Sequence, residues 1–325
     1  MPAPHAATIR PRHSGLIRPI LCAILVATPA LMPIPALAAD TAVPTAFTDA
    51  AARTDVVALG ERHDHAGHHR IQAAAYRALI AAGRRPALVM EMFSRDAQAA
   101  IDALTAGLGP SPTPAAVDEA LDRMPDVSGF TAGGWRDWSA YRPVVAVALD
   151  HGLPVLAADW PMADRRALSQ DGWQALPADF VTRFGLDQPA APAVVDGLTA
   201  AITAGHCGHA PEAALPAMIR VQRARDAGIA GAALDALARP DIDQALIIAG
   251  SGHVRRDLGA PLYLGDAAVL AVGLAETGAD DPEPGLRDPR PDEPFDLVWV
   301  AEAQPREDPC IAFRAALEAM NTAPK

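Results

Sequence analysis

The sequence predicts an α/β fold: a mostly parallel sheet with flanking helices and an inserted helical layer over the carboxyl ends of the strands. Three observations predict it. Short apolar runs of strand length recur along the chain. Alanine-rich stretches with helical periodicity separate them. Two of the runs, in residues 56–63 and 245–253, end in the same form: glycine, two residues, histidine. A continuous apolar run suits a strand covered on both faces, as in a parallel sheet.

The amino-terminal segment has the pattern of a secretory signal peptide. Arginines precede an apolar stretch, and Ala36 and Ala38 fit a cleavage motif. The stretch is too short for a membrane span. Cys22 opens it without the small residues that a lipoprotein signal places before its cysteine, which makes a lipoprotein the weaker interpretation. We therefore expect removal of residues 1–38 and export of the domain 39–325 to the periplasm or outer envelope.

We expect strands at 54–59, 86–91, either 144–149 or 154–159, 245–249, 268–274 and 296–302. Residues 66–82 have the periodicity of a helix. Two blocks, about 95–140 and 162–238, are helical by pattern with proline and glycine breaks, and we expect them to form the inserted layer. Residues 281–294 have the composition of an acidic, proline-rich surface loop, and a short helix follows from about Pro309.

Composition limits the partners. The net charge of −12 argues against nucleic acid or an anionic membrane as a partner. Cys207 and Cys310 remain after the predicted cleavage, and in an oxidising compartment two cysteines can form one disulfide. The absence of a CxxC pair excludes a zinc ribbon.

Histidines crowd the first strand–helix junction, at positions 63, 65, 68 and 69. Such a cluster would suit a metal ion or a haem, and the alternative is a solvated, histidine-rich helix start. His63 is the best candidate because open α/β sheets bind ligands at the carboxyl ends of their strands. Glu61 lies two residues earlier, and in an extended segment it faces the same way.

Glu91 ends the next predicted strand. A carboxylate after a buried strand is costly unless it is paired or functional, and the alternative to a functional role is a structural ion pair with a nearby arginine such as Arg95. Tyr141 follows two tryptophans in the segment 135–143. Aromatic rings can stack on a flat ligand, and a phenolate can bind ferric haem. The alternative is a helix that faces the core.

The later part of the chain adds polar groups. Residues 206–209, His-Cys-Gly-His, precede a helix on which Gln222, Arg225 and Asp226 share one face, with donors suited to carboxylates. The alternative is a solvated face. The second GxxH motif ends at His253, and its glycines and serine offer backbone N–H groups to an anion. We expect His63 and His253 to lie close together at adjacent strand ends.

On these residues the chain resembles the ChaN-like family of bacterial haem-binding uptake proteins, which belongs to a wider group with Tiki proteases, TraB proteins and erythromycin esterases. The matching segments are 57–65, 87–92, 138–143, 206–227, 248–261 and 308–310. The resemblance implies an exported α/β protein of haem or iron acquisition. It implies haem as the cofactor, and is compatible with a homodimer and with envelope haem-uptake components as partners.

Two functional hypotheses follow, with an envelope protein carrying a degenerate site as a third interpretation. The first is haem binding without catalysis, with an axial ligand from among Tyr141, His63, His209 and His253. The other groups of this pocket are Gln222 and the propionate donors Arg142, Arg225 and Arg255. The alternative is a Tiki-like hydrolase, in which a divalent metal ion is held by His63 and His253 together with Glu61 or Glu91. That ion would lower the pKa of a bound water. The resemblance along the whole length favours haem.

Overall fold

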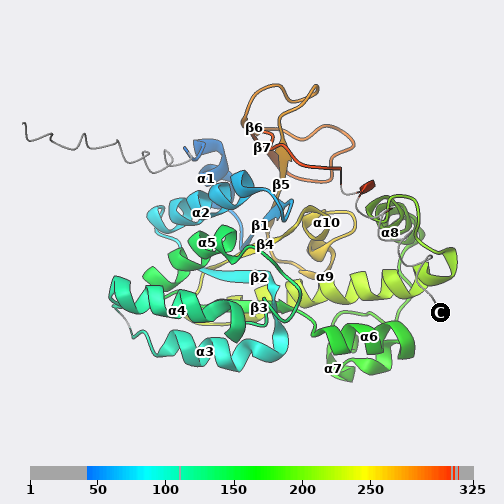
Figure 1. The fold of residues 1–325 in the computed structure, drawn as a ribbon, viewed down its shortest axis with the longest axis horizontal. Coiled ribbons are helices and arrows are strands. Elements are labelled where there is room, and N and C mark those ends of the chain that lie inside the picture. Colours follow the sequence, from blue (N-terminus) through cyan, green and yellow to red (C-terminus); the bar gives the residue numbers. More distant parts are fainter. Residues whose placement is uncertain (1–41, 110, 309, 312–313, 315–325) are drawn as a thin grey trace, which may run out of the picture. The chain divides into compact units, whose positions relative to one another are not determined.

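A computed structural model describes residues 42–109, 111–308, 310–311 and 314 (Figure 1). The chain divides into the units Met1–Ala39 and Asp40–Lys325, and the described residues all belong to the second unit. The predicted signal peptide, its cleavage site and most of the short helix expected from Pro309 lie outside the described residues. Within the described ranges, no helix combines the length and the apolar character needed to cross a bilayer.

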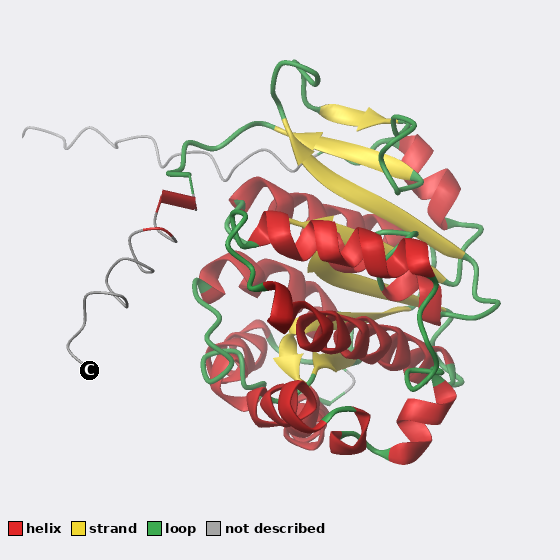
Figure 2. Ribbon diagram, turned by 90° about the vertical axis from the view of Figure 1, so that its right-hand side faces the viewer, coloured by secondary structure: helices red, strands yellow, loops and turns green. Residues whose placement is uncertain are grey.

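A seven-stranded sheet forms the centre of the fold (Figure 2), in the order β3-β2-β4-β1-β5-β7-β6. The strands are β1 (Val56–Glu61), β2 (Pro86–Ser94), β3 (Val155–Asp159), β4 (Gln244–Gly250), β5 (Val269–Glu276), β6 (Gly285–Arg287) and β7 (Leu297–Ala301). All pairs are parallel except β6 with β7. The predicted α/β class with a mostly parallel sheet is confirmed.

The two GxxH motifs end neighbouring strands. β1 and β4 are buried along their whole lengths, and their register pairs Glu61 with Gly250. Gly60 permits a close approach here, because a Cβ at this position would lie 2.2 Å from a methyl group of Val254. The turns after the two strands therefore emerge side by side at the carboxyl edge of the sheet.

Helices flank the sheet. They are α1 (Thr45–Ala51), α2 (Ala66–Ala81), α3 (Gln98–Ala106), α4 (Pro114–Val127), α5 (Trp138–Asp150), α6 (Met162–Asp171), α7 (Ala178–Arg183), α8 (Pro192–Gly205), α9 (Leu215–Leu237) and α10 (Ser251–Val254). Helix α2 packs on α5 and against β1 and β2, while α9 runs along β2, β3 and β4. The start of α6, the middle of α9 and the loop before α5 border the carboxyl edge of the sheet.

Two details differ from the sequence-based expectation. Of the two alternatives for the third strand, 154–159 is confirmed, whereas 144–149 lies in the buried helix α5. A short apolar run buried on several sides fits either periodicity, so composition could not separate them. The segment 281–294 is not entirely loop, because it contains β6, which pairs with β7.

A disulfide joins Cys207, in the connection between α8 and α9, to Cys310 near the end of the described chain. The two residues are 103 positions apart in the sequence. The disulfide that the sequence allowed between Cys207 and Cys310 is therefore present. It ties the segment after β7 to the helical hairpin formed by α8 and α9.

Candidate functional site

Glu61, at the end of β1, is the centre of a buried hydrogen-bond network. Its Oε1 accepts from His63 Nδ1 at 2.8 Å and from the Tyr141 hydroxyl at 2.5 Å. Its Oε2 accepts from Gln72 Nε2 at 2.6 Å and lies 3.3 Å from His69 Nδ1. Burial alone would raise the pKa of Glu61, but the hydrogen bonds from His63 and His69 outweigh it and lower the pKa to about 2. Glu61 is therefore an anion with its acceptor positions filled.

Glu91, near the end of β2, is a second buried carboxylate. It accepts from Arg225 NH2 at 2.5 Å and from the backbone N–H of Gly250 at 2.7 Å. His253 Nε2 lies 3.3 Å from its Oε1, and His63 Nε2 lies 4.0 Å from its Oε2. Burial alone would raise the pKa of Glu91, but the charges of His253 and Arg225 hold it well below its usual range. Both GxxH histidines therefore lie beside Glu91, and the predicted proximity of His63 and His253 is confirmed.

Arg225 links Glu91 to a third carboxylate, Asp159 at the end of β3. Its Nε donates to Asp159 Oδ1 at 3.0 Å, and Arg165 NH1 donates to Oδ2 at 2.6 Å. Glu91 forms an ion pair with an arginine, as the alternative interpretation expected, but the partner is Arg225 and not Arg95. Arg95 instead donates to a backbone carbonyl of α9 and lies over a tryptophan ring.

His253 is held from the α9 side. Its Nδ1 lies 2.6 Å from Asp226 Oδ1 and 3.0 Å from Gln222 Nε2. Burial alone would lower the pKa of His253, but the charges of Glu91 and Asp226 outweigh it and raise the pKa to about 9. The imidazole is therefore cationic at neutral pH, with both nitrogens engaged. The predicted polar face of α9 faces the strand ends and is not a solvated surface.

His63 is the exposed histidine of this cluster. Its side chain is 39% exposed, against 7% for His253 and 3% for His69. Its ring packs edge-on against Trp135, with 4.8 Å between centroids. Gly250 permits this position, because a Cβ there would lie only 2.8 Å from His63 Nε2. A ligand that reaches the cluster from solvent therefore meets His63 first.

The remaining predicted residues divide into two groups. Tyr141 belongs to the cluster, but it is buried, its hydroxyl donates to Glu61, and burial raises its pKa well above the usual range. Arg142 turns away to pair with acids of α4, and Arg255 pairs with an aspartate two residues later. His209 is exposed in the connection between α8 and α9. The structure thus pairs Arg142 and Arg255 with acids outside the cluster.

Two members of the network were missed in the sequence. Gln72 interrupts the apolar face of α2 three residues after His69, and such a buried amide calls for a partner. Asp159 ends β3 in the same way that Glu91 lies near the end of β2. Polar residues at the ends of apolar strands were the signal that could have found it.

A cavity of about 250 Å³ lies beside this cluster, at the carboxyl ends of β2 and β3. Its lining includes the apolar Met92, Trp135, Trp160 and Met162 and the charged Asp159 and Arg165. It adjoins the cluster on two sides, because Trp135 packs on His63 and Asp159 binds Arg225. The cavity is therefore mostly apolar and next to the exposed histidine.

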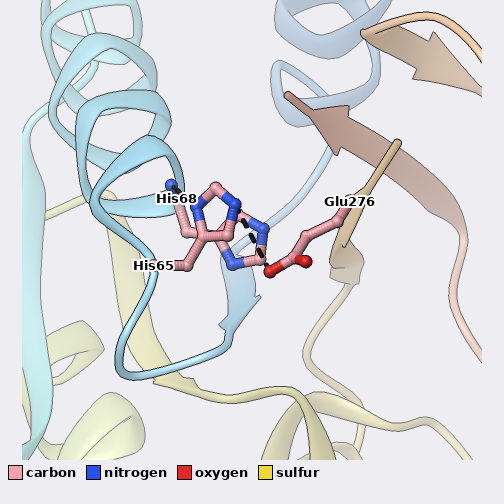
Figure 3. A group of neighbouring side chains, drawn as sticks. All are labelled: His65, His68 and Glu276. Atoms are coloured by element: carbon pink, nitrogen blue, oxygen red, sulfur yellow. Dashed lines mark hydrogen bonds and ion pairs between the residues drawn. The ribbon is translucent and has the colours of Figure 1, made fainter. Parts of the chain in front are cut away.

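His65, His68 and Glu276 form a separate group whose possible ligand atoms lie within 4.8 Å of one another (Figure 3). His65 Nδ1 accepts from the N–H of His68 at 3.1 Å, which caps α2. His68 Nδ1 accepts from the N–H of Arg62, and its Nε2 donates to Ala275 O. Burial lowers the pKa of His68 to about 4.

A neutral histidine carries one N–H donor and one acceptor nitrogen, and His68 uses both. A metal on Nε2 of His65 would require its Nδ1 to carry the proton, where it would meet the N–H of His68. Glu276 is already paired with Arg306. We therefore assign this group to the structure of the turn between β1 and α2 and not to a metal site.

The fold and the site define an α/β protein with histidines and carboxylates at the carboxyl edge of a parallel sheet. Residues 47–264 match the family described as haem-binding uptake, Tiki superfamily, ChaN. The chain therefore belongs to this family, as its sequence motifs predicted. A comparison with curated proteins by sequence gave no match.

Among solved structures, the chain is similar to ChaN of Campylobacter jejuni, whose structure is described as showing cofacial haem binding. The two share 18% identity over 80% of this chain and 91% of the other, with a TM-score of 0.57. Weaker likenesses are to the type III effector HopBA1 (14% identity, 77% and 88% covered, TM-score 0.42) and to a mutant erythromycin esterase EreC (12%, 86% and 82%, TM-score 0.39). At 18% identity, the likeness to ChaN of Campylobacter jejuni shows a shared fold. Nothing is inferred from the two weaker likenesses.

Proposed function

We propose that this protein is an exported haem-binding protein of haem or iron uptake, and that haem binds at the carboxyl edge of the sheet. Membership of a haem-binding family supports the choice of ligand. The location of the haem site is supported by the mostly apolar cavity beside His63, the exposed histidine of the cluster. Tryptophan and methionine side chains in its wall suit the face of a porphyrin.

His63 is better placed than Tyr141 to hold the iron. Its Nδ1–H donates to Glu61, and a carboxylate on the second nitrogen typically orients a metal-binding histidine and raises its basicity. Its Nε2 makes no hydrogen bond within the described part of the chain and has only the 4.0 Å approach to Glu91. The Tyr141 hydroxyl is buried and donates to Glu61. Haem bound at His63 would supply an iron centre for transport, without any reaction being required of the protein.

The size of the cavity indicates that it would enclose only part of a haem. Sites that bury most of a ligand usually have volumes of about 300–1,000 Å³, and this cavity has about 250 Å³. The porphyrin would therefore insert by one edge and leave the rest accessible, as transfer to another uptake component requires. A second copy of the chain that covers the accessible part completes the proposal. The cofacial haem binding described for ChaN of Campylobacter jejuni is in line with it.

The geometry supports haem over a divalent metal ion held by Glu61, His63 and His253. Glu61 already interacts with four polar side chains. His253 is cationic and engaged at both nitrogens. A metal would have to displace several of these hydrogen bonds.

Titration of the purified mature protein with haemin tests the proposal. We expect a saturable Soret shift that survives treatment with EDTA, changes strongly in His63→Ala and changes little in Tyr141→Phe. His151→Ala, an exposed histidine at the end of α5, is the matched control. No saturable shift in the wild-type protein would refute haem binding. A shift altered by Tyr141→Phe and not by His63→Ala would move the ligand to Tyr141.

Two further measurements address export and assembly. The amino terminus of protein recovered from the cell envelope should begin at Ala39, and a mature chain that keeps the leader would contradict export by a cleaved signal. Sedimentation with and without haemin should show dimers in the presence of haemin. A monomer that binds haemin with unchanged mass would remove the second copy from the proposal.

A further inference from the structure

Arg165 lines the cavity with most of its hydrogen-bonding capacity unused. Its side chain is only 21% exposed, and NH1 donates to Asp159 Oδ2 at 2.6 Å. A guanidinium has five N–H donors, and the other donors of Arg165 make no hydrogen bond among the described residues. Arg165 is partly exposed, and its other donors are not among the fully buried side-chain atoms that lack a hydrogen-bond partner. These donors are therefore available to an acceptor in the cavity that Arg165 lines.

The start of helix α6 lies beside Arg165 in the lining of the cavity. Pro161, at its N-cap, provides no side-chain hydrogen bond, and Pro161 and Met162 line the cavity together with Arg165. The first N–H groups of a helix lack partners within the helix and favour an anion. Asp164 lies in this first turn but is not part of the cavity lining.

Two carboxylates, Asp96 and Asp159, line the cavity together with Arg165. Asp159 is shared between Arg225 and Arg165 and also accepts from a backbone N–H. Asp96 is exposed and accepts from the hydroxyl of Ser94. The cavity therefore has an apolar wall and one end that provides donors. This distribution of polar groups suits a flat apolar ligand with a carboxylate at its edge.

We infer that Arg165 and the first turn of α6 bind a propionate of haem, an inference that rests on the proposed function. The sequence instead suggested Arg142, Arg225 and Arg255 for this role. Arg142 and Arg255 pair with acids outside the cluster, and Arg225 is engaged by Glu91 and Asp159. Arg165 is the arginine in the cavity lining, so it is the residue that meets the carboxylate.

Two probes and three variants test the inference. Haemin and its dimethyl ester, which lacks the propionate charges, are titrated against wild-type protein, Arg165→Gln, Arg165→Lys and Arg142→Gln. Arg142 is a matched control because its side chain is similarly exposed, at 29%, and also pairs with an acid. We expect Arg165→Gln to weaken haemin binding about tenfold, as for the loss of a hydrogen bond to a charged group. Arg165→Lys should weaken it less, and Arg142→Gln should leave it unchanged.

The dimethyl ester separates a contact with the propionate from a general effect on the cavity. Its affinity should be the same for wild-type protein and Arg165→Gln. Equal weakening of both probes would show that the variant disturbs the cavity, and unchanged haemin affinity would show that Arg165 does not meet a propionate. Either result overturns the inference while haem binding stands. Absence of haemin binding by the wild-type protein overturns the proposed function first, and this inference with it.

Discussion

Replacement of Glu91 by glutamine removes the charge that joins the two halves of the site and keeps the shape of the side chain. Glu91 is buried and receives Arg225 NH2 at 2.5 Å, the N–H of Gly250 at 2.7 Å and His253 Nε2 at 3.3 Å. Removing one member of a buried ion pair typically costs about 3–5 kcal/mol. Arg225 keeps Asp159 as a partner. We therefore expect the lower value, about 3 kcal/mol at pH 7.

Denaturant unfolding at pH 7 measures this cost, with a thermal melt beside it. For a domain of this size the expected loss corresponds to a drop in Tm of roughly 6 °C. Glu119→Gln, at an exposed position of α4, is the control and should change the free energy of unfolding by less than about 0.5 kcal/mol. If Glu91→Gln unfolds within about 1 kcal/mol of the wild-type protein at an equal m-value, Glu91 is not the charge that holds Arg225 and His253 together.

The pH dependence gives an independent check with a defined sign. The pKa of Glu91 in the folded protein lies well below 4.5, so its stabilisation is present above pH 4.5 and is lost as the pH falls through the folded value. The difference between wild-type protein and variant should therefore shrink in acid. The pKa of His253 is raised from 6.5 to about 9, so its stabilisation is complete below pH 6.5 and is lost as the pH rises through 9. Without the charge of Glu91, this alkaline loss should be smaller.

Two more predictions concern the turn after β4 and the disulfide. Gly250→Ala places a Cβ 2.8 Å from His63 Nε2, so it should displace the ring, cost about 1–3 kcal/mol and weaken the haemin Soret shift. Unchanged haemin spectra would contradict the role of His63. Cys310→Ser opens the link to Cys207 across 103 positions and should lower the free energy of unfolding by about 2–4 kcal/mol. Reductant should lower the Tm of the wild-type protein but not of this variant, and equal sensitivity of both would argue against the link.

Apolar runs determined much of the fold from the sequence. A strand buried on both faces needs an uninterrupted apolar run, so β1, β2 and β4 could be placed to within a few residues. The GxxH motifs at the ends of two such runs placed His63 and His253 together, because neighbouring parallel strands end at the same edge of the sheet. Where a run fits two periodicities, as at 144–149, only packing against the sheet decided that it is a helix.

The tertiary structure decided the roles of the site residues. Hydrogen-bond partners depend on which groups meet across elements far apart in the chain, and a local pattern does not contain that information. His65 and His68 cap and hold a turn, whereas His63 and His69 interact with Glu61. The partner of Glu91 is Arg225, 134 positions away, and not the nearby Arg95. The sequence thus determined that the ends of β1, β2 and β4 carry the chemistry, and tertiary contacts added the end of β3 and determined which side chains remain available to a ligand.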